Sequence, residues 1–556
     1  MGLQSPLTVE TDVLVIGGGA AGARAAIEAR DQGARVLLVN KGFLGRTGIT
    51  ASTTGGIGGF IQQPDNPEIY FQDIVKCGRH INNKDIVRLF VKEIADGNVM
   101  ELEQFGVTFD RDAKNKLRVL KMGGHSFPRM VMATWLNAPA ILRYGLIPQM
   151  LKKGVQVIDQ VVITKILLDG GQVSGAMGIN LKMGRSEVFR SKSIILATGN
   201  AGQLFGESAG LSATGDGYSL AYQAGARLRD MEFVSCSIGL AYPLTRRGKV
   251  LGEPATRKGS YPILYNSKRE FFMRQYFPDA LQGYTKDMYM YGISKEVREG
   301  RGTPHGGVWV DFSNLDPTGP SYPVFKEFMS SLTLDAQKGS AIECILAPYY
   351  FPGGVEFDEN HESTIRGLFA AGEASGGLHG AERLASTSMA ETIVFGKRAG
   401  CLAAYSALQK SRSAIDWEAI RREEQRLYQM LDQEGENLPI EVRKKIQKTM
   451  WNKVGFIRNG VKLSSAKEDL EAISSVDLRR TRIRSKNPKG NLDWLESIEN
   501  GFLLDVAHMV VGASLARQES RGSHYREDFP EQRDVWVKKI AISKDQGGMR
   551  FSIEDV

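Results

Sequence analysis

The sequence predicts an α/β fold that begins with a βαβ unit, and three features near the N-terminus support this prediction. The run Val13–Ile16 is apolar in the manner of a buried strand. It leads directly into Gly17-x-Gly19-x-x-Gly22, which is followed by an Ala-, Arg- and Glu-rich stretch typical of a helix. A second apolar run, Ala34-Arg-Val-Leu-Leu-Val-Asn40, follows at the distance expected for the next strand.

The three glycines predict a dinucleotide site at this strand–helix turn. Gly17 permits the tight turn, Gly19 lets the backbone approach a pyrophosphate, and Gly22 allows close packing of helix and strand. The N-terminus of the helix then presents N–H groups to the phosphates. Asn40 stands where such sites usually have an acidic residue, so we expect a weaker ribose contact through its carbonyl oxygen.

Length and charge bound the class of protein. A chain of 556 residues should form more than one domain, because single cores stop growing at roughly 250–300 residues. The net charge of +8 is mild and favours anionic ligands or an acidic protein partner, and no aromatic-interleaved basic motif predicts nucleic-acid binding. Neither a secretory signal nor an apolar run of ~18–20 residues is present, so we expect a cytoplasmic protein without a membrane span.

Cysteine and histidine are scattered along the chain. The four cysteines, Cys77, Cys236, Cys344 and Cys401, form no C-x-x-C pair, and the seven histidines form no ligand spacing. We therefore predict no metal site, and any metal cluster for long-range electron transfer would belong to another subunit.

Six further motifs follow in a fixed order: Leu196–Gly202, Thr214–Tyr218, Gly367–Ser375, His379–Leu384, Ser388–Gly396 and Ala516–Asp528. The series resembles the flavoprotein subunit of the succinate dehydrogenase/fumarate reductase family, in a wider group with L-aspartate oxidase and the adenylylsulfate reductase α-subunit. The resemblance covers nearly the whole chain.

The resemblance implies FAD as the dinucleotide and a specific domain order. A Rossmann-like FAD-binding domain would comprise residues 1–233 and 355–408, with an α+β capping domain inserted at 234–354. A helical C-terminal domain would comprise residues 409–556, and the Glu-, Arg-, Lys- and Leu-rich pattern of 409–473 independently predicts helices.

The resemblance also implies a set of FAD contacts. Thr198 and Gly199 would lie near the adenosine half, and Asp216 would hold ribose or ribityl hydroxyls, although it also suits a helix N-cap. Glu373 would reach the ribityl chain. The remaining implied cofactor-binding residues are Gly17, Gly19, Gly22 and Asn40, the pair Gly55 and Gly56, and Ser388 and Met389 at the flavin ring.

Two departures from the family pattern bear on the chemistry. Ile49 occupies the position of the histidine that attaches FAD covalently in many members, so we predict non-covalent FAD. The dicarboxylate pocket is also changed, at Ser237, Pro254, Ala255, Lys286 and Tyr349. Only Arg383 matches a carboxylate-binding residue of the family.

These departures predict an anionic substrate other than succinate or fumarate, because a dicarboxylate needs polar partners at both ends. Arg383 would anchor the anion and Lys286 would act as acid or base. Tyr349 would donate a proton or form an aromatic wall. Arg257 and Lys258 would bring further positive charge from the cap.

Three functions remain open at this point. The first is an FAD-dependent oxidoreductase that exchanges electrons with an iron–sulfur, ferredoxin-like subunit. The second is a non-catalytic electron-relay flavoprotein in a larger complex, and the third is an adenylylsulfate reductase-like enzyme. The basic stretch 479–489 is a solvated loop or a docking face for an acidic electron carrier, and the charged block Arg517–Arg526 predicts a structural ion-pair network.

Overall fold

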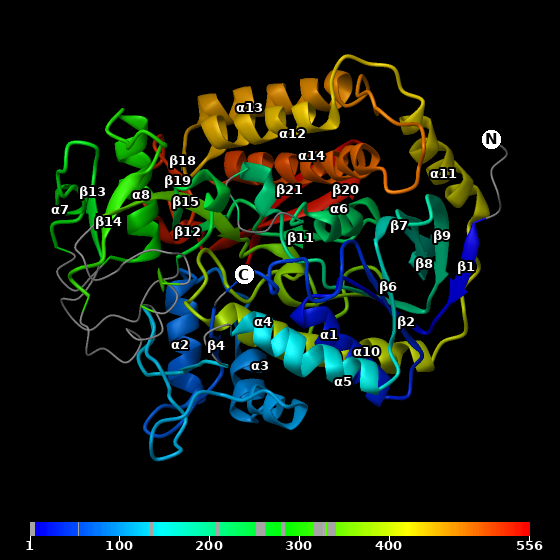
Figure 1. Ribbon diagram of the computed structural model, residues 1–556, viewed down its shortest axis with the longest axis horizontal. Coiled ribbons are helices and arrows are strands. Elements are labelled where there is room, and N and C mark those ends of the chain that lie inside the picture. The colour runs from blue at the N-terminus through cyan, green and yellow to red at the C-terminus, as the bar shows by residue number, and fades with distance from the viewer. Residues whose placement is uncertain are drawn as a thin grey trace.

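Figure 1 shows the computed structural model of the protein. It describes residues 6–53, 55–133, 137–206, 208, 212–251, 262–279, 284–315, 326, 329–330 and 341–556. Within these residues a parallel sheet lies near the centre, an antiparallel sheet with two helices lies at the left of the view, and long C-terminal helices run along the top (Figure 1).

The parallel sheet contains the predicted βαβ unit. Its strand order is β17-β10-β2-β3-β6, and every neighbouring pair is parallel. The strands are β17 (Leu368–Ala370), β10 (Ser193–Leu196), β2 (Val13–Ile16), β3 (Val36–Asn40) and β6 (Gln156–Asp159). Helix α1 (Ala20–Asp31) follows β2 directly, as the glycine pattern predicts.

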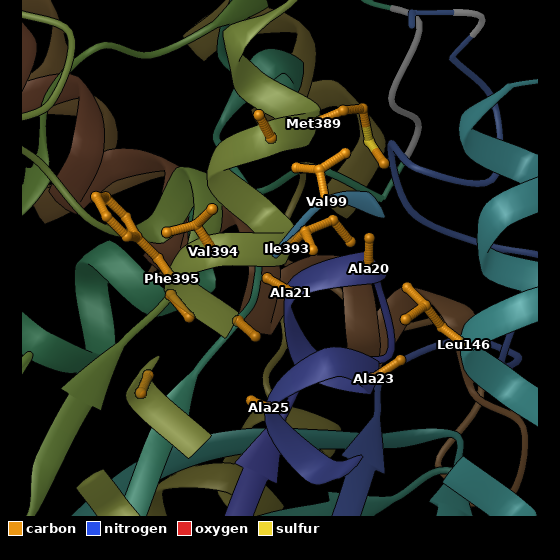
Figure 2. Packing of buried hydrophobic residues seen from close by; sticks show 14 of the residues in the cluster. Ala20, Ala21, Ala23, Ala25, Val99, Leu146, Met389, Ile393, Val394 and Phe395 are labelled. Atoms are coloured by element: carbon orange, nitrogen blue, oxygen red, sulfur yellow. The ribbon is translucent and has the colours of Figure 1, made fainter. Parts of the chain in front are cut away.

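Helix α1 packs tightly against α10 (Thr387–Leu408). Figure 2 shows Ala20 and Ala21 of α1 next to Ile393 of α10. Glycines on α10 permit this closeness, because a Cβ on Gly400 would lie 2.3 Å from the carbonyl oxygen of Ala25. The contact holds the N-terminus of α1 rigidly beneath the cleft.

A second sheet, of order β1-β9-β8-β7, lies in the predicted FAD-binding domain. Its strands are β1 (Leu7–Glu10), β9 (Arg185–Arg190), β8 (Gln172–Asn180) and β7 (Val161–Asp169). The remaining elements of this part are β4 (Ile57–Gly58), α2 (Pro67–Cys77), α3 (Lys84–Ala95), η1 (Met100–Phe105), β5 (Met130–Val131), α4 (Ala138–Ala140), η2 (Ile141–Leu146), α5 (Ile147–Lys152), η3 (Gly202–Phe205), α6 (Asp216–Gln223) and η5 (Gly372–Ala374).

The inserted region forms an antiparallel sheet of order β12-β15-β14-β13. Its elements are β12 (Ser235–Leu240), η4 (Leu244–Arg246), β13 (Ile263–Tyr265), α7 (Met273–Tyr276), α8 (Lys286–Arg298), β14 (Val308–Asp311) and β15 (Ile342–Tyr350). Ser235 pairs with Tyr350, so the start of β12 and the end of β15 meet at the boundary with the parallel sheet. The predicted limits of this domain, 234 and 354, stay a prediction.

The C-terminal region is mostly helical as far as Ala516, as expected, with one short strand among the helices. Its elements are α11 (Trp417–Leu431), α12 (Pro439–Thr449), η6 (Met450–Val454), β18 (Ile457–Arg458), α13 (Gly460–Ala472), η7 (Ile473–Asp477), α14 (Leu492–Ala516), β19 (Tyr525–Arg526), η8 (Asp534–Trp536), β20 (Lys538–Asp545) and β21 (Gly548–Asp555). The hairpin β20–β21 was not anticipated, and it joins β11 (Leu228–Arg229) and β16 (Gly354–Val355) in one sheet. No helix among the described residues has the length and apolar character needed to cross a membrane.

Candidate active site

A cleft opens at the carboxyl ends of β2, β3 and β10, where the parallel strands leave the sheet. Its lining comes from segments far apart in the chain: Ile16–Ala21, Asn40–Gly42, Thr47–Thr50, Thr53, Gly55, Val161, Ile163, Ala197–Gly199, Ser212, Ala213, Asp216, Leu220, Tyr349, Tyr350, Ala371, Glu373, Ser388, Met389 and Thr392. The crevice outside the carboxyl ends of parallel strands is where open α/β sheets bind their ligands.

The glycine turn leaves no room for side chains at two of its positions. Gly17 has φ +111°, and a Cβ there would lie 2.3 Å from the carbonyl oxygen of Ala197. A Cβ on Gly22 would lie 1.9 Å from the carbonyl oxygen of Gly17. Gly19 differs, since its nearest neighbour would be Thr50 Oγ1 at 3.4 Å, so its missing side chain keeps the cleft open.

Lys41 is a charged residue of the cleft that the sequence motifs did not reveal. Its Nζ lies 2.9 Å from Asp216 Oδ2 and 2.8 Å from Glu499 Oε1, and it donates to Thr214 Oγ1 at 2.6 Å. Burial alone would lower the pKa of Lys41, but the two carboxylates outweigh burial and raise it. Lys41 is therefore a fixed positive charge, and the only sequence signal for it was its position directly after the second strand.

Asn40 holds the turn rather than pointing freely at a ligand. Its Oδ1 accepts from Gly18 N at 3.3 Å, and its Nδ2 donates to Asp159 Oδ1 at 3.4 Å. Thr50 Oγ1 accepts from Ala20 N at 3.3 Å, so it also covers the first turn of α1.

Glu373 is a buried acid on the wall of the cleft. Its Oε1 accepts from Asn200 Nδ2 at 2.7 Å and from Phe351 N at 3.1 Å. Burial raises its pKa to about 8, although these hydrogen bonds act in the opposite direction. Burial therefore favours the protonated form of this carboxyl, whose O–H is a hydrogen-bond donor on the wall of the cleft.

Lys286, Tyr349 and Arg383 converge at one point next to the cleft. Lys286 Nζ donates to Tyr349 Oη at 2.7 Å, and Arg383 Nη2 also donates to that oxygen. The guanidinium carbon of Arg383 lies 5.2 Å from the Tyr349 ring centre and 5.1 Å from that of Tyr350. Three segments thus meet here: the start of α8, the end of β15 and the loop before α10.

Family comparisons agree with this architecture. The family model described as FAD binding domain matches residues 12–389, and that described as fumarate reductase flavoprotein C-term matches 443–556. A protein of Methanothermobacter marburgensis, named as one of the subunits of its fumarate reductase (CoM/CoB), is 35% identical over 547 residues, covering 96% of this chain and 97% of its own. The chain belongs to the fumarate reductase/succinate dehydrogenase flavoprotein family.

Solved structures show the same fold. A quinol–fumarate reductase chain superposes with TM-score 0.89 at 29% identity and covers 99% of this chain and 98% of that one. Adenylylsulfate reductase from Archaeoglobus fulgidus superposes with TM-score 0.78 at 20% identity, covering 100% and 97%, which shows a shared fold. This chain is accordingly an FAD-dependent oxidoreductase of that family.

The residues of the cleft fit FAD. The glycine turn and the N-terminus of α1 form a cradle for a pyrophosphate, with Gly19 open toward it. Thr198 Oγ1 is buried without a hydrogen-bond partner among the described residues, although Thr198 lines the cleft. A hydroxyl left unpaired in this way costs free energy unless a ligand completes it.

The other implied FAD contacts divide into two groups. Gly199, Asp216, Gly55, Ser388 and Met389 line the cleft. Two glycines instead face protein: Gly22 packs α1 on the turn, and a Cβ on Gly56 would lie 2.8 Å from Met130 Cγ. Asp216 pairs with Lys41, a partner that its motif did not predict.

Ile49 also lines the cleft, at the position where many family members have the attachment histidine. Ser237 is buried on β12. Pro254, Ala255, Arg257 and Lys258 lie outside the described residues.

The two charged stretches near the C-terminus differ in structure. Arg517 Nε lies 2.7 Å from Glu232 Oε1, with both side chains fully buried, so an ion-pair network is confirmed there. In 479–489, Arg484 pairs with Asp493 at 2.7 Å while its own side chain remains 66% exposed. Docking of an electron carrier on this stretch stays a prediction.

Proposed function

We propose that this chain is the substrate-converting flavoprotein subunit of a redox complex, and that its substrate is an anion other than succinate or fumarate. The observation that supports this proposal is the convergence of Lys286, Tyr349 and Arg383 beside the FAD cleft. Two cationic groups and a phenol at one point suit the binding of one anionic group and the transfer of a proton.

The charge distribution disfavours a small dicarboxylate. Burying two carboxylates requires cationic or hydrogen-bonding partners at both ends of the molecule. In the described part of the site both cations, Lys286 and Arg383, lie at the same point around Tyr349 Oη. One anionic end is served there, and Ser237 and Tyr349 each replace a histidine of the family's dicarboxylate pocket.

Each residue has a role in this proposal. Bound FAD supplies hydride transfer. Arg383 holds the substrate anion through charge-assisted hydrogen bonds, and its position over the Tyr349 and Tyr350 rings fixes its orientation. Lys286 moves the proton, directly or through Tyr349 Oη, to or from the reacting carbon. Burial of Arg383 excludes water from this contact and strengthens it.

The proposed electron partner is an iron–sulfur protein. The Methanothermobacter relative is named as one subunit of its enzyme, and this chain matches it over 97% of its length. Affinity purification of the chain from its native host should recover a partner whose absorption and electron paramagnetic resonance spectra show iron–sulfur clusters. Recovery of the flavoprotein alone, with full activity toward a soluble donor, would contradict the assignment.

Fumarate is the rival substrate, because that relative is named a fumarate reductase. With reduced viologen as donor, we expect negligible reduction of millimolar fumarate and measurable reduction of another unsaturated acid in a panel. Robust fumarate turnover would refute the substrate proposal.

Arg383→Ala should weaken substrate binding by ~1.5–3 kcal/mol, the usual contribution of a hydrogen bond to a charged group.

The electron-relay alternative has one observation in its favour. Arg383 already donates to Tyr349 Oη and to the carbonyl oxygen of Leu384, so both of its terminal nitrogens have a protein partner without a substrate. A relay predicts that Arg383→Ala and Lys286→Met both pass electrons between carriers at near the parent rate. An adenylylsulfate reductase-like activity rests on the shared fold, and adenylylsulfate belongs in the same panel of oxidants.

A further inference from the structure

Glu382, next to Arg383 in the chain, is a buried carboxyl without a role in the proposal above. It is 5% exposed. Its Oε1 accepts from Ser235 Oγ at 2.6 Å and from Arg383 N at 3.0 Å. Its Oε2 is buried, and no donor within the described part of the chain reaches it. A carboxylate with one bare buried oxygen is costly, whereas a carboxylic acid places a proton on that oxygen.

Charged and titratable groups from several of the described elements act on Glu382. Lys286 and Asp287 come from the start of α8, Cys77 from the end of α2, and Cys236 from β12. Arg383 belongs to the same loop. Burial raises the pKa of Glu382, and Lys286 and the Ser235 hydrogen bond offset this only in part. The carboxyl therefore keeps its proton to a higher pH than an exposed glutamate does.

The surroundings of Glu382 connect the cleft with solvent. On the inner side, Lys286 Nζ lies 2.7 Å from Tyr349 Oη, and Tyr349 lines the cleft. On the outer side, Asp287 pairs with Arg79 at 2.8 Å, and these two side chains are 23% and 35% exposed. Lys286 Nζ also donates to the carbonyl oxygen of Arg383 at 3.4 Å, so the lysine lies beside the loop that carries Glu382.

We propose that Glu382 is the proton reservoir of the site, a positioning residue that acts through Lys286 and does not touch substrate. The inference rests on the proposed role of Lys286. When Lys286 has given its proton to the substrate carbon, the O–H bond of Glu382 breaks and an N–H bond forms on the lysine. The carboxylate left behind is reprotonated from solvent. No electron moves in these steps.

Infrared difference spectroscopy of the FAD-loaded protein tests the protonation state without any substrate. Photoreduction of the bound flavin places charge near Tyr349 and should perturb the C=O band of a protonated carboxyl. Glu382→Gln should remove this band, and it keeps the acceptor for Ser235 and Arg383 N. Glu391→Gln, which alters a second buried carboxyl bonded to Tyr350 and His379, is the matched control and should retain it. An unchanged spectrum in Glu382→Gln would overturn the proposal.

The pH dependence of the midpoint potential of bound FAD gives the second readout. The parent protein should take up one more proton per two electrons over the pH range in which Glu382 ionises, and Glu382→Gln should lose this uptake. Glu382→Asp should restore it, and Ser235→Ala should move it to higher pH, because the lost hydrogen bond favoured the ionised form. A purely structural role predicts identical slopes in parent and Glu382→Gln, and that result would refute the reservoir.

Failure of the proposed function remains distinguishable from failure of the reservoir. If no acid in the panel is converted but the carboxyl band and the extra proton are present, the substrate proposal fails and Glu382 still buffers the flavin site. If an acid is converted and Glu382→Gln turns over at the parent rate with normal FAD content, the reservoir is wrong.

Discussion

Lys286 carries a transferable proton and lies beside the cleft. It begins α8 at the boundary between the capping sheet and the cleft, and its Nζ donates to Tyr349 Oη at 2.7 Å and to the carbonyl oxygen of Arg383 at 3.4 Å. A residue in this place has more effect on turnover than on folding, since it is only half-buried and its partners retain other contacts.

Lys286→Met should therefore reduce turnover by roughly 10²–10⁴ in steady-state assays with the acid that the panel identifies, because it keeps the side-chain bulk and removes the transferable proton. FAD content, measured from flavin absorbance per chain, should stay normal. Lys268→Met alters an exposed lysine of the same domain and should be silent. Equal rates in the two variants would contradict the assigned role.

The isoleucine at position 49 predicts that no covalent bond joins FAD to the chain there. An isoleucine side chain has no nucleophile, so FAD should be held by non-covalent contacts alone. Acid precipitation should release all of the flavin into the supernatant. Flavin fluorescence that remains on the denatured chain in a gel would show attachment at another residue.

Helix α1 depends on glycine more strictly than its sequence pattern suggests. Gly22 lies within the helix, where glycine is normally unfavourable, but a Cβ there would meet the carbonyl oxygen of Gly17 at 1.9 Å. The close fit places the helix N-terminus directly behind the turn, where it can face phosphates.

Gly22→Ala should destabilise the protein by ~1–3 kcal/mol through overpacking and should lower FAD content. Gly501→Ala in α14 is the comparison. A Cβ at Gly501 would meet no atom within 4 Å, so this substitution should stabilise the protein by about 0.5–1 kcal/mol. Thermal unfolding of both variants, with FAD released and quantified, measures the difference. A neutral Gly22→Ala would show that the turn can shift.

The C-terminal helices are coupled to the cofactor cleft across the whole molecule. Glu499 of α14 holds Lys41 at 2.8 Å and Arg443 of α12 at 2.8 Å, so one carboxylate joins the cleft to two helices (Figure 1). Burial alone would raise the pKa of Glu499, but Lys41 and Arg443 outweigh burial and lower it.

Because the folded pKa of Glu499 is depressed, its contribution to stability is present above the unfolded value of about 4.3 and is lost as the pH falls through the folded pKa. Glu499→Gln should cost roughly 3–5 kcal/mol near neutral pH, as for removal of one partner from a buried pair, and should weaken FAD binding. The gap from the parent should close in acid. Urea unfolding across pH tests this, with the exposed Glu418→Gln as control.

Short-range pattern was enough to predict the βαβ unit, a dinucleotide-binding turn and the helical character of the C-terminal region. A glycine turn between an apolar strand and a helix encodes its own geometry, because its constraints act between neighbours in the chain. Departures from the family pattern, such as Ile49, can also be recognised from the sequence, because each concerns a single position.

Tertiary structure decided which distant side chains meet. Lys286, Tyr349 and Arg383 were each singled out, but their shared contact at one phenolic oxygen depends on how three segments pack. Lys41 with Glu499, and Glu382 with Ser235, had no sequence signal, since these partners are hundreds of residues apart or lie across a domain boundary. Local sequence determined the turns and helices of this protein, and burial of charge between packed elements determined which of its ionisable groups work together.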